Sequence, residues 1–477
     1  MILKVINHPY EFDMKNICTA FFPYEKIKSD GEEDISVITK IDGGTLSVSV
    51  QVFDKKLNKT HTLKDDEDTA LAMSVLLYDT LSEILGFRSA WGVLYGVRPA
   101  KLMHRFSQEY GEEGARRYFT EKFLVSPEKA DLTATVAEHE NRIISLSREN
   151  SFSLYVSIPF CPTRCAYCSF VSHSVERTKR LVEPYVDLLC TELERIGKIA
   201  RDLNLRLETI YFGGGTPTTL SAPQLKKIFT AVRDNFDLSN LREYTVEAGR
   251  PDTVDRDKLL TLRDFDITRI SINPQTFNDS VLEAIGRKHT CAQTLEAFAL
   301  ARDCGFDNIN MDLIAGLPTD TLKSFENSVD TAVKLGADSV TVHTLALKTA
   351  AYLVTRETAF DMTDRITASK MVDYSRQTLT KHDYIPYYMY KQSKSVANLE
   401  NVGWCQDGKP CLYNVFMMDE THSVFAAGAG AVTRLKDSKS GKIQRIYNYK
   451  YPYEYIDNFD NIISRKEGIY DFYSEYK

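Results

Sequence analysis

The segment Leu154–Phe170, LYVSIPFCPTRCAYCSF, places three cysteines directly after a short apolar run. Cys161, Cys165 and Cys168 follow the spacing C-x-x-x-C-x-x-C. A four-iron, four-sulfur cluster normally takes four thiolates, so three thiolates leave one iron open to an external ligand. The alternatives are a zinc site completed by His173 and a chance grouping. The spacing favours a [4Fe-4S] cluster with one open iron.

The apolar run before the cysteines is the first of six short runs that alternate with amphipathic helical patterns. The runs begin at Leu154, Thr209, Tyr244, Ile267, Ile309 and Ser339. Strands that alternate with helices predict a parallel sheet with right-handed crossovers. Six units are too few for a closed eight-fold barrel. Residues 151–350 are therefore predicted to form an open, partial (β/α)6 barrel.

Different patterns flank this region. Residues 1–150 begin with alternating strands around an Asp42–Gly43–Gly44 turn and continue with a helix from about Asp68, which predicts an α+β domain. The polar stretch His139–Ser151 is expected to connect this domain to the barrel. Residues 351–477 mix helical and strand patterns and are predicted to form a mixed α/β region that covers the substrate. The fold class is therefore α/β, with an added domain at the amino terminus.

Polar groups stand at or near the ends of the predicted strands. Gly213-Gly214-Gly215-Thr216 ends the second strand, and consecutive glycines let a ligand approach the backbone. Glu247 ends the third strand, Gln275 follows the fourth, Asp312 lies in the fifth, and Arg287 lies beyond Gln275. Each residue by itself is also compatible with an ordinary cap or salt bridge. Because the carboxyl ends of parallel strands meet at one edge, the set favours a shared cofactor site.

Composition narrows the class of protein. The formal charge is -7, with both signs interspersed, which argues against nucleic acid as the main partner. No apolar run approaches the roughly 20 residues needed to cross a bilayer. The start MILKVINHPYEFD has charges where a signal peptide would need its apolar stretch, so no signal peptide is expected there. The protein is therefore predicted to be cytoplasmic, without membrane insertion. In that reducing compartment the nine cysteines are not expected to form a disulfide framework.

Several motifs together resemble one family. YVSIPFCPTRCAYCSF, YFGGGTPT, VEAGRPD, RISINPQTF, IGRKHT and MDLIAGLPTDT are similar to the oxygen-independent coproporphyrinogen III oxidase (dehydrogenase) family of radical S-adenosylmethionine (SAM) enzymes. The segment WGVLYGVRP, from Trp91, resembles the amino-terminal extension of the HemZ-like branch. The resemblance covers most of the chain from about residue 85 onward. It implies a radical SAM barrel with a [4Fe-4S] cluster and SAM.

The resemblance also implies which residues bind these cofactors. Cys161, Cys165 and Cys168 would be the cluster ligands. The implied SAM contacts are Tyr155, Tyr167, Gly214, Gly215, Thr216, Glu247, Gln275, Arg287, Asp312, Ala346 and Val432. Members of the family can bind two SAM molecules, which would account for the number of contacts. No side chain is assigned a catalytic role.

The reaction that the resemblance implies is the conversion of coproporphyrinogen III to protoporphyrinogen IX. A reduced cluster cleaves SAM, the resulting 5′-deoxyadenosyl radical removes a hydrogen from each of two propionate groups, and loss of carbon dioxide and an electron leaves a vinyl group. A low-potential electron donor and an unidentified electron acceptor would be partners. Basic residues must hold the substrate carboxylates, and the candidates are Arg98, Lys101, Arg105 and Arg434.

Two departures keep other functions open. Phe170 replaces a cysteine of the bacterial oxidases, as it does in haem chaperones of the same superfamily. Those chaperones typically carry a His-Asn pair where this chain has Tyr413-Asn414. The alternatives are therefore a haem-binding chaperone and another radical SAM enzyme that acts on a tetrapyrrole, such as a haem-opening methyltransferase.

The remaining conspicuous residues are expected to be structural. Cys18, Cys190, Cys291 and Cys304 are predicted to be buried packing residues, whereas Cys405 and Cys411 could also bind a second metal. His289, His343 and His422 are predicted to be structural rather than catalytic. The stretch Gly428–Ala431, GAGA, lacks the context of a dinucleotide-binding motif. It predicts a close backbone approach to the mouth of the barrel.

Overall fold

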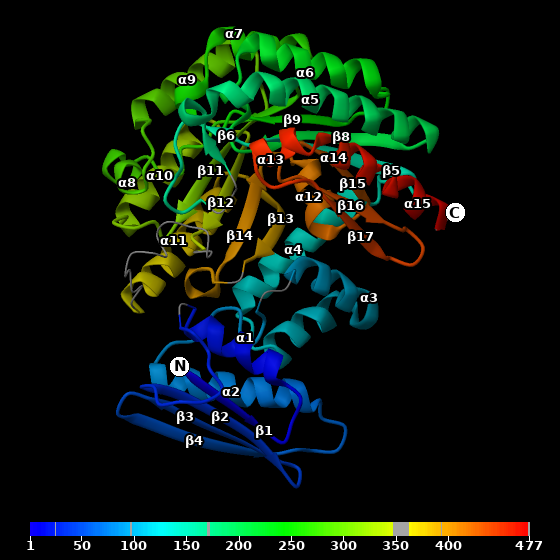
Figure 1. Cartoon of the computed structure of the whole chain (residues 1–477). Coiled ribbons are helices and arrows are strands. Elements are labelled where there is room, and N and C mark those ends of the chain that lie inside the picture. Colours follow the sequence, from blue (N-terminus) through cyan, green and yellow to red (C-terminus); the bar gives the residue numbers. More distant parts are fainter. Residues whose placement is uncertain (24, 96–97, 169–171, 347–361, 393, 476–477) are drawn as a thin grey trace.

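Eleven strands form one sheet through the centre of the protein, in the order β13-β14-β12-β11-β10-β9-β8-β5-β15-β16-β17. The computed structural model describes residues 1–477 except 24, 96–97, 169–171, 347–361, 393 and 476–477 (Figure 1). The six predicted strands are adjacent and parallel, as expected: β5 (Ser151–Ile158), β8 (Arg206–Gly214), β9 (Glu243–Glu247), β10 (Arg269–Ser271), β11 (Ile309–Ala315) and β12 (Ser339–Thr344). The prediction of a partial barrel of six parallel strands is confirmed.

Helices cover the outer face of these strands (Figure 1). They are α5 (Val175–Asp202), α6 (Ala222–Asn235), α7 (Arg256–Asp264), α8 (Asp279–Ala284), α9 (Cys291–Asp303) and α10 (Leu322–Lys334). Capping residues start several of them: Ser221 accepts from Gln224 N, and Thr290 from Gln293 N. Apolar strand residues such as Ile210, Val246 and Leu313 are fully buried under this layer. The core therefore lies between sheet and helices.

Carboxyl-terminal strands extend the sheet at both ends. On one side β14 (Glu400–Cys405) pairs antiparallel with β12 and with β13 (Ile385–Lys391). On the other side β15 (Ser423–Ala427) lies parallel to β5 and is followed by β16 (Val432–Lys436) and β17 (Ile443–Tyr447). The helices of this region are α11 (Met362–Lys381), α12 (Leu412–Asp419), α13 (Pro452–Asp457), α14 (Phe459–Lys466) and α15 (Gly468–Glu475). The predicted boundary at residue 350 lies outside the described residues.

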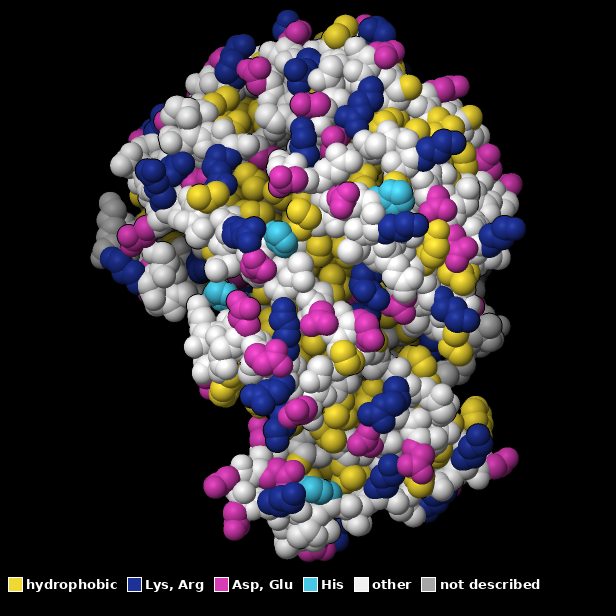
Figure 2. Space-filling view, turned by 180° about the vertical axis from the view of Figure 1, so that it is seen from behind, with side chains coloured by type: hydrophobic (Ala, Val, Ile, Leu, Met, Phe, Trp, Pro, Cys, Tyr) yellow, Lys and Arg dark blue, Asp and Glu magenta, His cyan; other side chains and the backbone are white. Residues whose placement is uncertain are grey.

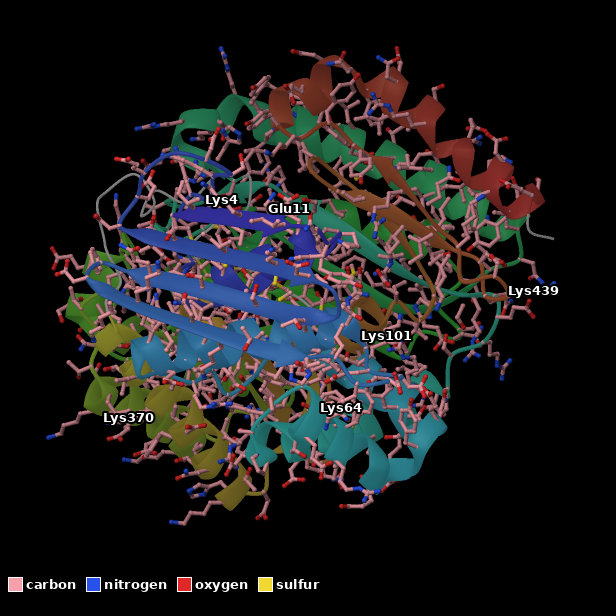
Figure 3. All side chains as sticks on the ribbon, turned by 90° about the horizontal axis from the view of Figure 1, so that it is seen from below. Lys4, Glu11, Lys64, Lys101, Lys370 and Lys439 are labelled. Atoms are coloured by element: carbon pink, nitrogen blue, oxygen red, sulfur yellow. The ribbon has the colours of Figure 1, made fainter. Side chains whose placement is uncertain are left out.

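The amino-terminal sheet is separate. It contains β1 (Ile2–Ile6), β2 (Ile35–Asp42), β3 (Thr45–Val52) and β4 (Lys55–Thr62), and its buried face packs against α1 (Glu11–Phe21) and α2 (Thr69–Leu85). The predicted Asp42–Gly43–Gly44 turn joins β2 to β3, with φ of 51° and 84° at the glycines. Asp68 caps α2 by accepting from Leu71 N. Figure 3 shows this sheet at one end of the molecule, with its outer face turned away from the helices.

Residues 1–150 contribute to two cores. The first core belongs to the four-stranded sheet and its two helices. The side chains of α3 (Pro99–Arg117) and α4 (Pro127–Ile144), together with Trp91, join the core of the barrel instead. Helix α4 also runs into the stretch His139–Ser151, so the predicted connection is wrong for its first half and comprises only residues 145–150. Glu140 and Ile143 are buried in this last part of the helix, and Ile143 packs in one cluster with Tyr387, Tyr413 and Phe416 of the carboxyl-terminal region.

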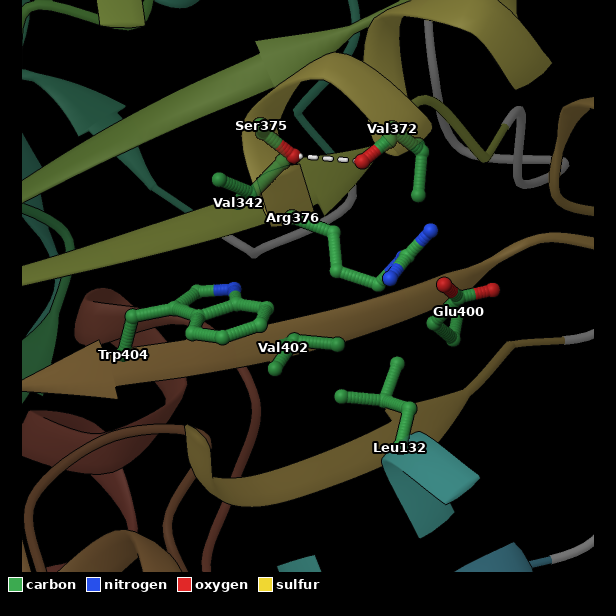
Figure 4. Close-up of a pocket in the computed structure, with 8 residues that line it drawn as sticks. All are labelled: Leu132, Val342, Val372, Ser375, Arg376, Glu400, Val402 and Trp404. Carbon is green, nitrogen blue, oxygen red and sulfur yellow. Dashed lines mark hydrogen bonds between the residues drawn. The ribbon is translucent and has the colours of Figure 1, made fainter. Parts of the chain in front are cut away.

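A buried ion pair fastens α4 to the barrel. Lys129 Nζ lies 2.7 Å from Glu400 Oε1, and Trp91 Nε1 donates to Glu400 Oε2 at 2.7 Å. A small cavity of about 10 Å³ lies beside Glu400, between Leu132 of α4, Arg376 of α11 and Val402 of β14 (Figure 4). The segment around Trp91, whose role the sequence left open, is therefore part of the barrel.

Charges of both signs are interspersed on the face shown in Figure 2. Every helix among the described residues falls short of the length or apolarity that crossing a bilayer would take.

Candidate active site

One cavity of about 410 Å³ reaches from the carboxyl ends of the parallel strands into the interior of the barrel. Its volume is within the range of pockets that hold small ligands. Twelve of the fourteen residues predicted to bind the cluster or SAM line it: Cys161, Cys165, Tyr167, Cys168, Gly214, Gly215, Thr216, Glu247, Gln275, Arg287, Asp312 and Ala346. Tyr155 and Val432 do not line it. The structure therefore brings most of the predicted site together at one edge of the sheet.

The cysteines lie on a loop that is held from several sides. Cys168 N donates to Cys165 O at 3.1 Å, and Ala166 N donates to Ile285 O at 2.9 Å. Thr216 Oγ1 donates to Cys161 Sγ at 3.5 Å, and Arg250 Nη1 lies 4.0 Å from Cys165 Sγ. Burial raises the pKa of the Cys161 thiol, while hydrogen bonds from Thr216 and Ser172 oppose that shift. Donors aimed at sulfur favour thiolates, the form that binds iron.

These thiols suit a cluster better than one metal ion. Among the described residues, no three His, Cys, Asp or Glu side chains gather at the ligand distances of a single ion. In a cubane cluster each thiolate binds a different iron, so the sulfurs stand farther apart. His173, the possible zinc ligand, points elsewhere, because its ring packs edge-on against Tyr451 at 5.7 Å. The three thiols lie within eight residues of one loop and line one cavity, so each can bind a different iron of a single cluster.

The glycine run allows close backbone packing. A β-carbon on Gly215 would stand 2.5 Å from Phe160 O, and one on Gly214 would stand 2.8 Å from Ser157 Oγ. Gly214 also has φ of 99°. Gly215 N and Thr216 N donate to Ile158 O and Phe160 O, both at 2.7 Å. The glycines were expected to let a ligand approach the backbone. They also let their own loop pack closely against the segment Ile158–Phe160, which precedes the cysteines.

Glu247 and Tyr211 form a hydrogen-bonded pair at the cavity wall. Tyr211 Oη donates to Glu247 Oε1 at 2.6 Å. Burial raises the pKa of Glu247 to about 7, although the hydrogen bond from Tyr211 lowers it. The carboxyl group can therefore keep its proton near neutral pH and donate it to a ligand.

Asp312 is held in its ionised form. Burial alone would raise the pKa of Asp312, but His343 and the hydrogen bond from Asn310 keep it below its usual value. Asn310 Nδ2 donates to Asp312 Oδ1 at 2.7 Å, and His343 Nε2 lies 3.8 Å from Asp312 Oδ2. The cavity thus places a carboxylate on β11 and a carboxyl group on β9, with β10 between the two strands.

Comparison with known proteins identifies the family. Residues 155–332 match the model of the Radical SAM superfamily. The oxygen-independent coproporphyrinogen-III oxidase-like protein HemZ of Bacillus subtilis is 34% identical over 443 residues, which cover 92% of this chain and 88% of that protein. The chain belongs to this oxidase-like family of radical SAM proteins. A [4Fe-4S] cluster and SAM are accordingly its cofactors.

Other relatives carry two different names. The heme chaperone HemW of Bacillus subtilis is 41% identical over 197 residues, 41% of this chain and 51% of that protein. The structure of coproporphyrinogen III oxidase (HemN) from Escherichia coli has a TM-score of 0.53 and 21% identity, and covers 68% of this chain and 72% of its own. That likeness shows the fold alone.

Within this radical SAM fold, two predicted residues lie away from the cavity. Tyr155 lies behind the cavity wall, where its ring stacks on Tyr211 at 6.2 Å and on Tyr413 at 6.1 Å. Val432 begins β16, one strand beyond β15. Neither side chain lines the space available to SAM in the described part of the chain.

The predicted ligands for substrate carboxylates lie outside the cavity. Arg98 Nη1 lies 2.7 Å from Glu420 Oε2, and Lys101 and Arg434 approach the same carboxylate at 3.7 and 3.8 Å. Arg105 stacks on Phe106 at 5.0 Å. None of these four side chains lines the cavity. Glu420 pairs with Arg98, Lys101 and Arg434 because it lies at the end of α12, beside α3 and β16. The local sequence does not encode this proximity.

Sequence reasoning missed several cavity residues. They are Arg250, Arg269, His343, Tyr388, Tyr390, Asn401 and Asn414. His343 was predicted to be structural, but it lines the cavity and shares a hydrogen bond of 3.2 Å with Tyr390 Oη. His343 stands two residues after Thr341 in β12, and residues two apart in a strand point to the same face, so the pair of polar residues was a signal that both face the cavity. Tyr388, Tyr390 and Asn401 come from strands added by tertiary pairing, for which no local signal exists.

The other residues expected to be structural have mixed outcomes. His422 is buried between Ser147 and Ser153, with contacts of 2.8 Å to each, and His289 is buried without a partner among the described residues. Cys18 and Cys304 are buried, but Cys190 and Cys291 are only partly buried. Gly428 makes the close approach that was predicted, since a β-carbon there would stand 2.5 Å from Ser157 O.

Two sequence differences bear on the alternatives. Phe170 lies outside the described residues. Asn414 lines the cavity, while the ring of Tyr413 stacks on Tyr211 at 4.6 Å, behind the wall. Cys405 and Cys411 are buried, and Cys411 Sγ lies 3.4 Å from Glu243 Oε1.

Proposed function

We propose that the protein converts coproporphyrinogen III to protoporphyrinogen IX by oxidative decarboxylation of two propionate groups. Each step removes one hydrogen atom and one electron from a propionate and releases carbon dioxide, which leaves a vinyl group. The hydrogen is accepted through SAM cleavage, and the electron must go to an external acceptor. The nearly full-length likeness to an oxidase-like protein supports this reaction over the alternatives.

Two guanidinium groups in the cavity carry the proposal. Arg269 and Arg287 are 3% and 9% exposed, and among the described residues neither has a carboxylate within ion-pair distance. Buried charges are normally paired, because burying an isolated ion is very unfavourable. Arg287 Nη1 donates to Asn273 O at 2.7 Å, while its Nε has no partner among the described residues. Arg269 donates to Asn308 Oδ1 at 2.9 Å and to Ser339 Oγ at 2.8 Å, so Arg287 is the group with the greater need of an anion, which a ligand carboxylate of SAM or of a tetrapropionate substrate would supply.

The remaining cavity residues would orient these ligands. When bound, the cluster and SAM supply the removal of a hydrogen atom from an unactivated carbon. The three cysteines would hold the cluster at one end of the cavity, next to the proposed SAM contacts Gly214, Gly215 and Thr216. Glu247 can donate its proton to a ligand, and Asp312 can accept from an ammonium or hydroxyl group. Tyr388 and Tyr390 would line the substrate side and exclude water.

Anaerobic turnover tests the proposal. Reconstituted protein is incubated with reductant, SAM, coproporphyrinogen III and an electron acceptor, and porphyrins are separated after oxidation. We expect a three-carboxylate intermediate and then protoporphyrinogen, dependent on SAM and acceptor. Cys165→Ala should abolish formation of 5′-deoxyadenosine, whereas the matched change Cys190→Ala, outside the cavity, should retain it. Wild-type SAM cleavage by the Cys165 variant would contradict the cluster assignment.

A haem chaperone is the second candidate, and specific observations favour it. Proteins named heme chaperone are among the relatives, and His343, Tyr390, Cys411 and Met418 line the cavity with groups that can bind haem iron. We expect haem to bind no more tightly than to a generic hydrophobic pocket. Stoichiometric, submicromolar haem binding without any porphyrin product under SAM-replete, reducing conditions would replace the oxidase proposal. Formation of S-adenosylhomocysteine would point instead to a methyltransferase.

A further inference from the structure

Four basic side chains converge on a single carboxylate at the end of α12. The nitrogen atoms nearest to the carboxylate oxygens of Glu420 are Arg98 Nη1 at 2.7 Å, Lys101 Nζ at 3.7 Å, Arg434 Nη1 at 3.8 Å and Arg445 Nη2 at 3.9 Å. We call these five residues the Glu420 cluster. They come from the start of α3, the end of α12 and the strands β16 and β17, which lie next to one another in Figure 1.

The Glu420 cluster lies at the opposite end of the parallel strands from the cysteines. Val424 of β15 pairs with Arg434 on one side and with Ser153 on the other. Ser153 is near the start of β5, whereas the cysteines follow the end of that strand. No residue of the cluster lines the cavity in the described part of the chain. The cluster is therefore separate from the candidate active site.

Positive charge is in excess in the Glu420 cluster. Four cations and one carboxylate give a formal charge of +3, and among the described residues no other carboxylate lies within 4.0 Å of these cations. The adjacent Asp419 instead accepts a hydrogen bond from Thr421 Oγ1 at 3.0 Å. Lys436, whose Nζ donates to Thr421 O at 3.1 Å, adds a further positive charge nearby. The whole chain carries -7, so the excess is not a result of basic composition.

Part of this charge stabilises the carboxyl terminus of α12. Arg434 donates to two carbonyl oxygens of the helix at 3.0 and 3.3 Å, and Lys101 donates to a third carbonyl oxygen at 2.8 Å. This role leaves donors unused. Arg434 is 6% exposed, and its Nε has no partner among the described residues. A buried guanidinium nitrogen without an acceptor indicates that an acceptor is missing from the cluster.

Glu420 holds the position that an external anion would take. Its backbone has φ of 62° and ψ of 44°, a left-handed conformation that is unfavourable for glutamate. Burial by itself would raise the pKa of Glu420, but the hydrogen bond and charge of Arg98 hold it below its usual value. The side chains of Arg98, Lys101 and Arg445 are 39%, 48% and 47% exposed. An anion in solution can therefore reach the same cations.

We propose that the Glu420 cluster is a binding site for a small anion with at least two negative charges on carboxylate or phosphate groups. Glu420 neutralises one of the four cations, so three positive charges remain for the ligand. Arginine binds carboxylate and phosphate through paired N–H groups, and the cluster offers three arginines. The cations converge on one point instead of forming a stripe, which favours a small anion over a nucleic acid. This inference does not depend on the tetrapyrrole substrate.

Calorimetric titration tests the site with two probes, pyrophosphate for phosphate groups and tricarballylate for carboxylates. The holoprotein is used with its cluster oxidised and with saturating SAM, so that the cavity is occupied and SAM is not cleaved. The visible absorbance of the cluster establishes that neither probe removes iron. We expect one saturable site per chain at low salt.

Charge removal at the cluster should weaken this binding. The variant R98Q/K101Q/R445Q should bind the probe at least about tenfold more weakly, because hydrogen bonds between charged groups are lost. The matched control K4Q/K55Q/K56Q removes the same charge from exposed positions of the amino-terminal sheet and should bind as wild type does. Circular dichroism and the unfolding midpoint establish that each variant is folded. The single change Arg445→Gln, on the edge strand β17, leaves the contacts of α3 intact and should weaken binding at least about threefold.

Glu420→Gln provides a test with the opposite sign. Removing the internal carboxylate should strengthen pyrophosphate binding at least about threefold and lower the unfolding midpoint of the free protein. Pyrophosphate should then raise the midpoint of this variant more than that of wild type, because a ligand that binds only the folded state stabilises it. Glu138→Gln, which removes a carboxylate from an exposed pair with Arg142, should change neither quantity.

Other outcomes overturn the proposal. Equal losses in the two triple variants would show that only net charge matters. The absence of saturable binding for both probes, or binding that disappears when SAM is added, would show that the cluster is not the site. Binding of one probe alone would support the proposal and assign the site to phosphate or to carboxylate groups.

Discussion

The ion pair between Lys129 and Glu400 predicts a large, pH-dependent effect on stability. Lys129 Nζ lies 2.7 Å from Glu400 Oε1, and the two side chains are 3% and 1% exposed. Burial by itself would raise the pKa of Glu400, but the ion pair with Lys129 and hydrogen bonds from Lys129 and Trp91 hold it below its usual value. Lys129→Met leaves a buried carboxylate without its counter-ion. Removing one partner of such a pair destabilises by about 3–5 kcal/mol.

The sign of the pH effect follows from Glu400. In the wild-type protein its lowered pKa stabilises the fold above the pKa of the unfolded chain, about 4.3, and this stabilisation is lost as the pH falls. In the Lys129 variant the pKa should rise, so ionising Glu400 becomes increasingly unfavourable as the pH increases. We therefore expect the loss to be largest at pH 8 and to shrink to roughly 1–2 kcal/mol at pH 5.

Urea unfolding at both pH values measures this effect. The chain has two tryptophans, Trp91 and Trp404, and both lie in this region, so their fluorescence reports on it. Lys198→Met removes the same group from an exposed pair with Asp202 and should cost less than about 1 kcal/mol. The double variant K129M/E400Q should recover part of the loss. A loss below about 1 kcal/mol at pH 8, or one independent of pH, would refute the reasoning.

Two further predictions follow from the site and its surroundings. Gly428→Ala should lower the free energy of unfolding by about 2–4 kcal/mol, because φ is 96° and the added β-carbon would stand 2.5 Å from Ser157 O. The control Gly441→Ala has φ of 70° but no atom near the added β-carbon, so it should cost only about 1 kcal/mol. Thermal unfolding of both variants measures the difference. Glu247 has a pKa raised to about 7, so the ligand-free protein should lose stability as the pH rises from about 4.5 to 7. Glu247→Gln should remove this loss, so at pH 8 the variant should be more stable than wild type by at most about 3 kcal/mol in the free energy of unfolding. The same change should weaken SAM binding. An identical dependence of stability on pH in both proteins would contradict the raised pKa.

The sequence determined the parts of this protein that depend on local chemistry. Each of the six parallel strands coincides with an apolar run, because the strand residues packed under the helices, such as Ile210, Val246 and Leu313, are buried and apolar. The cysteine spacing fixed the cluster loop, since three thiols within eight residues can hold one cluster without help from distant segments. Polar residues at strand ends could be placed at one edge because parallel strands end together.

Tertiary structure decided what those elements meet. The positions of β14 beside β12 and of β13 beside β14 put Tyr388, Tyr390 and Asn401 into the same cavity as the cysteines. Arg98, Lys101 and Arg434 form ion pairs with Glu420 outside the cavity, and Glu400 joins Trp91 and Lys129 of α4 to the barrel. Most of these pairings join segments that are far apart in the sequence, and their free energy comes from the summed packing, hydrogen bonds and charges of the assembled fold. A local sequence pattern does not determine this summed free energy, so only the folded structure shows which segments pair.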